Sequence, residues 1–406
     1  MLVMFRFKNY GSFKDEAVLD MRAIKSYKEH PYHLISTSDS SSLLKTVAIY
    51  GANASGKSNL VKAYNSFLRI VCNSFRKKDK RESKTILEEE YYPFFFDGEA
   101  RGADTEFEAV FHDNGSEYQY GFIYNSKRIQ YEWLYKRNLS NHRLSKILER
   151  DSEKIVLGSS VVKACEKYLA DIDTDVLALS FFSSLRLRSS VFRDTLSCIT
   201  ELLPLTFVDD SEQGYWIERY FAKNFNEEEK KPFLAFLKSI DTGIIDVSVE
   251  KSNDKLSVYT SHLGRDKETY KYPLEIESDG TRRAIAIYSF VRIAVRFGAG
   301  LLFDELNDQL HPLLQKHIID QFYEDNSQGQ LIYTTHDTSL MDKQFMRRDQ
   351  IWFVTKNQEG ESSLYSLSDF KIRNDKSFEK DYLEGVYGGI PILGEFSFTE
   401  DNNGHR

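Results

Sequence analysis

The chain has 406 residues, 41% of them hydrophobic, and a formal net charge of −8. This length can bury a sizeable core, in one large α/β domain with an insertion or in two lobes. The acidic balance argues against a general electrostatic attraction to nucleic acid, although it does not exclude a local basic groove. Three widely separated cysteines favour neither a disulfide framework nor a zinc site, so we expect a cytoplasmic protein. No apolar run is long enough to cross a bilayer, and we expect no membrane association.

Two strands and a helix are predicted near the start of the chain. Leu2–Lys8 predicts a half-exposed strand, which a turn at Asn9–Ser12 follows. Thr46–Tyr50 is short, rich in β-branched residues and almost wholly apolar, as in a buried strand of an α/β sheet. Apolar residues at helical spacing then run from Leu60 to Leu68. A loop of nine residues therefore connects a buried strand to a helix.

That loop has the sequence GANASGKSN and fits the pattern GxxxxGK[ST]. Its glycines allow the backbone to curl around phosphate oxygens, and the helix start points free N–H groups at an anion. Lys57 is expected to reach the β and γ phosphates of ATP, and Ser58 to bind Mg²⁺. The predicted nucleotide-binding residues are Gly51, Asn53, Ala54, Ser55, Gly56, Lys57, Ser58 and Asn59. The alternative is a glycine-rich turn with a solvated lysine, which the flanking strand and helix disfavour.

The middle of the chain predicts an antiparallel β meander and then a helical insertion. Arg76–Lys84 is a charge run that predicts a solvated loop, with a phosphate-backbone contact as the alternative. Aromatic residues alternate with others over three predicted strands, and we interpret them as one face of a core rather than a base-stacking platform. From about Leu144 to Lys238 the pattern becomes helical. The clearest helical stretches are 161–169, 178–187 and 216–237, and strands return at 244–249, 256–259 and 269–274.

Two acidic residues end a predicted strand in the second half of the chain. Gly300–Phe303 is apolar and runs directly into Asp304 and Glu305. At the carboxyl end of a strand, Asp304 would lie beside the phosphate loop and hold Mg²⁺. Glu305 would act as the general base or orient the attacking water. The alternative is an ordinary strand end that leads into the turn at Leu306.

A helix start and a histidine complete the set of candidate residues. Ser278, Asp279, Gly280 and Thr281 precede an amphipathic helix, in which Ser278 can cap the backbone and Gly280 permits close approach to an anion. Alone, this segment indicates only a well-capped helix. His336 follows another apolar strand, where a histidine is often a buried or capping residue, and its candidate contact with a γ-phosphate is implied by the family resemblance described next. A second histidine, His311, precedes Pro312 and is expected to cap or pack at a helix start.

Along the chain, the phosphate loop, the Ser278 helix start, the strand with Asp304 and Glu305, and the strand before His336 follow one another in the order that is found in ABC-type ATPase heads. The chain therefore resembles that class. Within that class the chain resembles stand-alone bacterial AAA-type ATPases grouped with the OLD-family and SMC-like heads, including RloA, abortive-infection ATPases and the ATPase subunit of the PARIS phage-defence system. The segments that carry this resemblance are Gly51–Asn59, Ser278–Arg283, Leu310–Pro312, Thr334–Asp337, Arg348–Val354 and Tyr387–Pro391. The signature lacks the wording LSGGQ, Ala54 replaces a glycine, and Gln309 replaces a common serine. No Q-loop glutamine can be assigned, because Gln119 and Gln130 lie in the meander.

The resemblance implies a fold and a division of the chain. We expect a P-loop ATPase head of the α/β class, with a mixed sheet, the antiparallel meander and an inserted helical lid or arm. Residues 1–143 would form the N-terminal lobe with the Walker A loop, and 144–240 the insertion. Residues 241–406 would form the C-terminal lobe with the signature, the Walker B acids and the switch histidine, His336.

The resemblance also implies a mechanism with ATP and Mg²⁺ as cofactors. Lys57, Ser58 and Asp304 of one subunit would hold the nucleotide, and the signature residues of another subunit, Ser278 and Gly280, would cover it. The segment Asn307–His311 would contact the partner subunit. ATP would then join two heads, as a homodimer or within a higher oligomer, and hydrolysis by Glu305 would release them.

Three functions are compatible with this mechanism. The first is a sensor or scaffold in bacterial anti-phage defence by abortive infection, working with a separately encoded effector such as a nuclease. The second is an SMC- or RecF-like DNA-maintenance ATPase, which would show a long coiled coil or a basic DNA face; the acidic balance and the missing heptads count against it. A transporter ATPase subunit is a weaker third, because the insertion is too large and the signature atypical.

Overall fold

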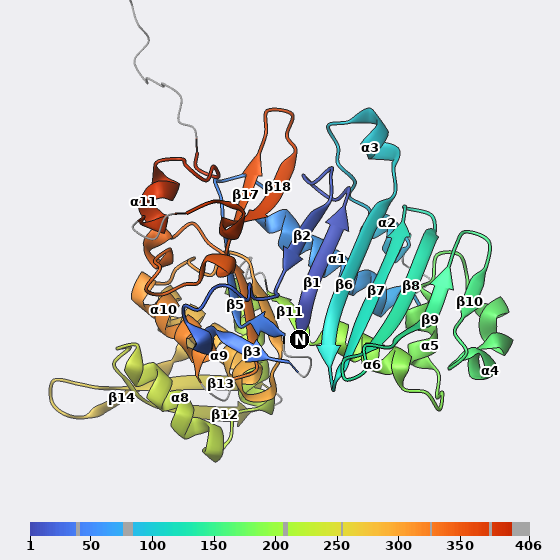
Figure 1. Cartoon of the computed structure of the whole chain (residues 1–406). Helices are drawn as coiled ribbons and strands as arrows, with labels where there is room; N and C mark the ends of the chain where they lie inside the picture. The colour runs from blue at the N-terminus through green and yellow to red at the C-terminus, as the bar shows by residue number, and fades with distance from the viewer. Residues whose placement is uncertain are drawn as a thin grey trace, which may run out of the picture.

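The computed structural model describes residues 1–37, 41–75, 84–205, 210–252, 255–324, 327–372 and 376–391, with the side chains of 210–213, 252 and 255 left aside. The predicted charged loop, apart from Lys84, lies outside these residues. Two large sheets lie side by side, and most helices pack against them (Figure 1). No helix in the described part of the chain is long and apolar enough to cross a bilayer.

The first large sheet is antiparallel and contains the predicted meander. Its strand order is β10-β9-β8-β7-β6-β1-β2. The strands are β1 (Leu2–Lys8), β2 (Ala17–Asp20), β6 (Thr105–Asp113), β7 (Ser116–Tyr124), β8 (Ile129–Asn138), β9 (Leu144–Arg150) and β10 (Ile155–Leu157). Phe107 of β6 and Phe122 of β7 are partners in register, and both are fully buried. The alternating aromatics therefore form a core face, as predicted, because successive residues of a strand point to opposite sides.

The second sheet is the one that ends at the phosphate loop. Its order is β11-β15-β16-β5-β17-β18, and all neighbours are parallel except the pair β17–β18. The strands are β11 (Leu202–Leu205), β15 (Gly300–Phe303), β16 (Gln330–Thr334), β5 (Thr46–Tyr50), β17 (Ile351–Lys356) and β18 (Ser362–Ser366). This mixed sheet agrees with the α/β class that the sequence predicts.

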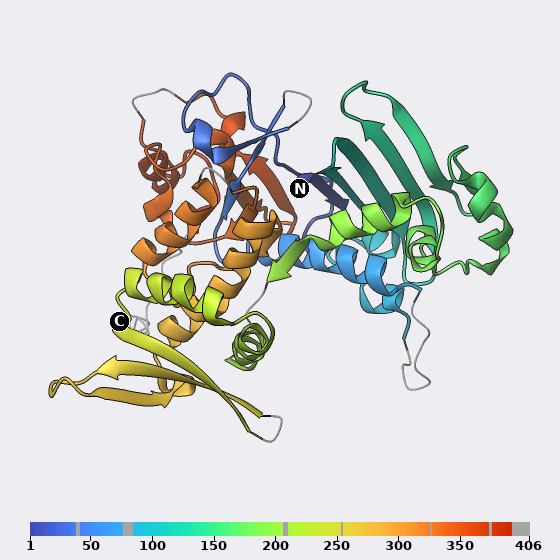
Figure 2. The same ribbon diagram turned by 90° about the horizontal axis from the view of Figure 1, so that it is seen from below.

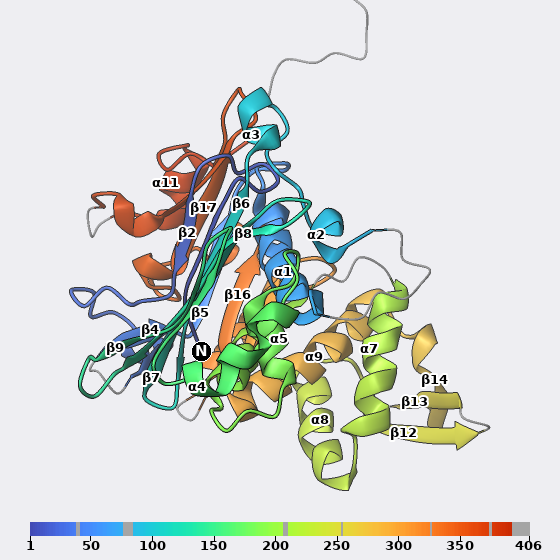
Figure 3. The same cartoon turned by 90° about the vertical axis from the view of Figure 1, so that its right-hand side faces the viewer.

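The remaining strands are short or lie apart from the large sheets. A three-stranded antiparallel sheet contains β12 (Ile244–Ser252), β13 (Lys255–Leu263) and β14 (Thr269–Pro273), as the sequence predicts. Together with α7 (Asp210–Lys223) and α8 (Glu227–Ser239), this small sheet projects away from both large sheets (Figure 3). A two-stranded sheet contains β3 (Leu34–Ser36) and β4 (Ser42–Leu44). The helices are α1 (Lys57–Asn73), α2 (Ile86–Glu89), α3 (Gly98–Gly102), α4 (Val162–Cys165), α5 (Ala178–Ser184), α6 (Val191–Thr200), α7 (Asp210–Lys223), α8 (Glu227–Ser239), α9 (Asp279–Phe297), α10 (Pro312–Asp320) and α11 (Phe378–Leu383).

The central strand β5 supplies residues to two hydrophobic cores. Val47 and Ile49 pack into a core that includes α1 and the inner face of the antiparallel sheet. Ala48 and Tyr50 belong to a second core, on the other face, with α9 and α10. Figure 2 shows α1, in blue, running beneath the antiparallel sheet. Because β5 is buried on both faces, the loop that follows it is anchored firmly.

The segment predicted to be helical from Leu144 differs in part. Leu144–Arg150 and Ile155–Leu157 are strands β9 and β10, which extend the meander by pairing beyond β8. Strand β11 joins the second sheet beside β15. The hydrophobic periodicity within one segment does not show which strand that segment pairs with. The predicted helix 216–237 is two helices, α7 and α8, and the Asn226 side chain caps the second by accepting from two backbone N–H groups. The lobe boundaries themselves remain a prediction.

A buried carboxylate joins the meander to α5. Glu132 of β8 is 1% exposed and accepts hydrogen bonds from the backbone nitrogens of Ala178 at 2.8 Å and Leu179 at 2.9 Å. The Tyr120 hydroxyl donates a third at 3.0 Å. Burial raises the pKa of Glu132, and the backbone donors and Arg150 oppose that rise. The carboxylate therefore acts as an internal cap for the first turn of α5.

Replacing Glu132 by alanine is expected to lower the free energy of unfolding by about 3 kcal/mol, because the buried N–H groups of α5 lose their acceptors. Urea denaturation followed by circular dichroism measures this change. Glu153→Ala, in the exposed β9–β10 turn, is the control and should stay within about 0.5 kcal/mol of the wild type. Equal stability of the two variants would contradict the capping role.

Candidate nucleotide-binding site

The predicted site residues follow adjacent parallel strands. The phosphate loop follows β5, Asp304 and Glu305 follow β15, and His336 lies two residues after β16. Because β15, β16 and β5 are neighbours and parallel, their carboxyl ends meet at one edge of the sheet. A cavity of about 590 Å³ opens there. The residues that line it are Asn53, Ala54, Ser55, Gly56, Lys57, Ser58, Asn59, Glu305, His336 and Lys356.

The backbone of the loop explains its small residues. Gly56 has φ 115°, and a Cβ atom there would lie 2.5 Å from Ser362 Oγ and 2.6 Å from Ser12 Oγ. Any larger side chain would displace these hydroxyls. Ala54, which departs from the family pattern, has φ 61°, a left-handed conformation that glycine adopts more easily. The loop therefore holds a residue with a side chain at a position where glycine would be under less strain.

The Lys57 side chain folds back over the loop. Its Nζ donates to the carbonyl oxygens of Gly51 at 2.8 Å and Ala52 at 3.1 Å, and the residue is 5% exposed. Burial lowers the pKa of Lys57 to about 8, while the charges of Glu305 and Asp304 oppose that decrease. An ammonium group held at the cavity wall by neutral carbonyls is suited to bind an anion.

Thr334 at the end of β16 fixes both acidic residues. Its Oγ1 donates to Asp304 Oδ1 at 2.7 Å and accepts from the Glu305 backbone nitrogen, also at 2.7 Å. Asp304 does not line the cavity. The Thr334 hydroxyl connects its carboxylate to the backbone of Glu305, which does. Glu305 has φ 53°, an uncommon conformation for a residue with a side chain. The Glu305 carbonyl oxygen accepts a hydrogen bond from Arg283 of α9 at 3.3 Å. Arg283 is 1% exposed, so this contact is internal to the core.

His336 faces the same acid from the neighbouring strand. Its Nε2 lies 3.7 Å from Glu305 Oε1, and its backbone nitrogen donates to Asn307 Oδ1 at 3.3 Å. Burial lowers the pKa of His336, Lys57 lowers it further, and Glu305 opposes both effects. A largely neutral imidazole can donate a hydrogen bond to a phosphate oxygen through one nitrogen.

The signature segment lies elsewhere. Ser278 caps α9 as predicted, because its Oγ accepts from the Thr281 nitrogen at 3.2 Å. Ser278 and Asp279 are exposed, and none of the four signature residues lines the cavity beside Lys57. The structure thus brings the phosphate loop, Glu305 and His336 to one cavity, and neither Asp304 nor the signature residues line it.

Other histidine and glutamine predictions have clear outcomes. His311 caps α10, since its Nδ1 accepts from the Leu313 nitrogen at 3.2 Å. Gln119 lies in β7 and donates to Glu108 Oε1 at 2.7 Å within the antiparallel sheet. Sequence reasoning missed Lys356 and Arg283 as residues of the site. The segment Arg348–Val354, which carries part of the family resemblance, ends two residues before Lys356. Its sequence alone does not show that β17 pairs with β5.

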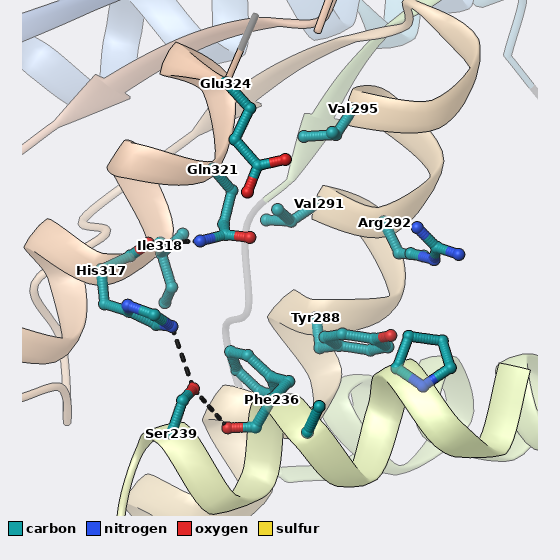
Figure 4. Close-up of a pocket in the computed structure, with 12 residues that line it drawn as sticks. Phe236, Ser239, Tyr288, Val291, Arg292, Val295, His317, Ile318, Gln321 and Glu324 are labelled. Carbon is teal, nitrogen blue, oxygen red and sulfur yellow. Dashed lines mark hydrogen bonds between the residues drawn. The ribbon is translucent and has the colours of Figure 1, made fainter. Parts of the chain in front are cut away.

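A second cavity, of about 310 Å³, is surrounded by three parts of the chain (Figure 4). These are α8, α9, and α10 together with the short 3₁₀ helix Gln321–Tyr323 that follows it. Phe236, Tyr288, Val291 and Ile318 give it an apolar lining. At its edge the Ser239 hydroxyl lies 3.0 Å from His317 Nε2 and donates to the Phe236 carbonyl. It shares no lining residue with the first cavity. None of the predicted site residues lines this second cavity.

Residues 47–342 match the family described as "AAA domain, putative AbiEii toxin, Type IV TA system". The chain belongs to this AAA family. The match extends from β5 past His336, so it includes every predicted site residue. The protein is thus a P-loop ATPase head of the AAA type, a class that uses nucleotide and typically Mg²⁺. None of the curated proteins matches the chain.

Solved structures similar to this AAA protein include three SMC heads. One is an SMC head bound to the C-winged helix domain of ScpA, with 16% identity over 94% of this chain and 99% of that chain, at a TM-score of 0.46. The SMC head domain from Thermotoga maritima has 14% identity over 91% and 99%, at a TM-score of 0.43. A Pyrococcus yayanosii Smc head with a coiled coil and joint has 14% identity over 95% and 99%, at a TM-score of 0.46.

Proposed function

We propose that the protein binds MgATP in the cavity at the β5–α1 loop and hydrolyses it to ADP and phosphate. The observation that carries this proposal is the convergence of the loop, Glu305 and His336, from three adjacent parallel strands, on one cavity. Phosphoryl transfer asks a protein mainly for positioning and for neutralisation of charge. The cavity offers both, through backbone N–H groups at the start of α1 and the buried ammonium group of Lys57.

In this proposal each residue has a distinct task. Lys57 exchanges the carbonyl oxygens of its own loop for β and γ phosphate oxygens. Ser58 and Asp304 are the residues that would hold Mg²⁺, which when bound neutralises charge on the phosphates. Their hydroxyl and carboxylate oxygens suit this hard cation, and the Thr334 hydroxyl fixes the orientation of Asp304.

Glu305 and His336 would act at the γ-phosphate end of the cavity. The Glu305 carboxylate is half-exposed and faces the cavity, so it can accept a proton from an attacking water. His336, whose Nε2 lies 3.7 Å from Glu305 Oε1, can donate a hydrogen bond to the γ-phosphate. The left-handed backbone of Glu305, held by Thr334 and Arg283, supports a fixed position for this base.

A further part of the proposal is that two heads share each site. The signature residues do not line the cavity of their own chain, and Ser278 is exposed, so this segment is available to cover the ATP of a second subunit. In a twofold dimer this contact would occur twice, because each head would cover the site of the other in an isologous interface. ATP would stabilise the dimer or a higher oligomer, and hydrolysis would release it.

For its cellular role we propose a cytoplasmic sensor or scaffold in anti-phage defence, acting with a separately encoded effector such as a nuclease. The AbiEii-type description of its family supports this direction. An SMC- or RecF-like role in DNA maintenance is less well supported, since the longest helix in the described part, α9, has 19 residues. Pull-down with the product of the neighbouring gene tests the first role, and salt-dependent stimulation of ATPase activity by DNA would favour the second.

The binding step is tested by Lys57→Ala. We expect MgATP affinity to fall by at least about 30-fold, because several charge-assisted hydrogen bonds to phosphate are lost. Isothermal titration calorimetry measures the change. Lys62→Ala, which removes an exposed lysine from the same helix, is the matched control and should bind normally. Unchanged affinity in Lys57→Ala would place the nucleotide elsewhere.

A further inference from the structure

One cation that lines the nucleotide cavity has no role in the mechanism above. Lys356 is the last residue of β17 and is exposed. It forms no ion pair with any residue in the described part of the chain. By contrast Lys14, on a nearby turn, is engaged by Asp97 at 3.0 Å and Glu361 at 3.1 Å. Lys356 is therefore an available positive charge at the cavity wall.

The end of β17 is held in place against the phosphate loop. Lys356 is the register partner of Ser362 in β18. The Ser362 hydroxyl donates to the Ser55 carbonyl oxygen at 2.5 Å, and its Oγ lies 2.7 Å from Ser12 Oγ, whose own hydroxyl can donate to it. On the other side, β17 pairs in parallel with β5, with Phe353 beside Tyr50. The end of β17 is thus held by its two neighbouring strands, β5 and β18 (Figure 1).

The order of strands gives the direction of the phosphate chain. Glu305 and His336 follow β15 and β16, which lie on one side of β5. Lys356 ends β17, on the opposite side of β5. If the γ-phosphate lies by Glu305 and the phosphates follow the loop, the far end of the chain is directed towards Lys356. This argument rests on the proposed ATP site.

We propose that Lys356 binds the α-phosphate of the nucleotide. The loop, through Lys57, neutralises the β and γ phosphates, and a second lysine on the opposite wall neutralises the charge that remains. An exposed ammonium–phosphate contact is modest in strength, so Lys356 would tune affinity rather than turnover. Because ADP keeps its α-phosphate, the contact would retain the product as well as the substrate.

The test compares ligands as well as variants. Lys356→Ala should weaken the binding of MgATP and MgADP by similar factors, about three- to tenfold, and should also weaken inorganic tripolyphosphate. The value of kcat at saturating ATP should remain within about twofold of the wild type. Lys356→Arg should restore most of the affinity, and Lys127→Ala, an exposed lysine in the β7–β8 turn, should change nothing.

Three results would overturn the assignment. Unchanged affinity for both nucleotides would leave Lys356 as a solvated side chain. Loss of ATP affinity without loss of ADP affinity would place the lysine at the γ-phosphate. Loss for both nucleotides but not for tripolyphosphate would place it at the nucleoside. An error in the proposed ATP site can be told apart from an error in the role of Lys356. If the ATP site is wrong, Lys57→Ala will bind MgATP with normal affinity.

Discussion

Replacing Glu305 by glutamine is expected to reduce ATP turnover by at least about 100-fold and to leave MgATP affinity within about twofold of the wild type. The amide keeps the shape of the side chain and its backbone bond to Thr334. It cannot take a proton from water, however. Because bound ATP then persists, the variant should form an ATP-dependent dimer or larger oligomer that the wild type forms only transiently.

Phosphate release under saturating ATP measures the first effect, and light scattering after gel filtration with ATP and Mg²⁺ measures the second. Glu153→Gln makes the same chemical change in an exposed turn and should behave as the wild type. Normal hydrolysis by the Glu305 variant would refute its assignment as the base. A monomer that retains ATP indefinitely would preserve that assignment and refute the ATP-dependent assembly.

Replacing Ser278 by arginine should abolish turnover while ATP binding persists, since the residue lies outside the cavity of its own chain. The variant loses the hydrogen bond from the Thr281 nitrogen to Ser278 Oγ. Because Ser278 is exposed, we expect only a small decrease in the free energy of unfolding. Calorimetry with MgATP and a phosphate-release assay separate the two properties. Equal loss of binding in Ser278→Arg and Lys57→Ala would contradict a shared site.

Mixing these two inactive variants gives a sharper test. In a mixed dimer, one site pairs the intact loop of the Ser278 variant with the intact signature of the Lys57 variant. Equal mixing should therefore restore about a quarter of the wild-type rate, because about half the dimers are mixed and each has one working site. No recovery, with mixed dimers demonstrated by tagged pull-down, would show that each head works alone.

Local chemistry made much of the fold predictable. The apolar strand β5, the glycine-bounded loop and the spacing of α1 are contiguous, so their sequence specifies their structure directly. Ser278 and His311 cap helices as predicted, because a cap depends on neighbours two or three residues away. The carboxyl-edge rule for parallel strands predicts that the acidic pair after Phe303 lies beside the loop, and Glu305 of that pair lines the cavity.

What escaped prediction depends on distant pairing. Strand β11 has only four residues and borders β15, which lies far away in the sequence. Strand β9 pairs with the preceding strand β8, but its sequence LSKILER has the apolar spacing of a short helix. Lys356 reaches the cavity because β17 pairs with β5, a neighbour that lies far away in the sequence. Arg283 contacts the Glu305 backbone across the core, and nothing in its local sequence indicates that partner.

The contact between Arg283 and Glu305 has a consequence for the proposed dimer. Helix α9 begins at the signature, which would serve the neighbour's ATP, and about one turn later it carries Arg283, which touches the head's own glutamate. One rigid helix would thus report the occupancy of one site to the base of the other. The two sites would then be coupled, so that nucleotide in one site helps to orient the glutamate of the other, while a dimer with a single intact site keeps part of its activity.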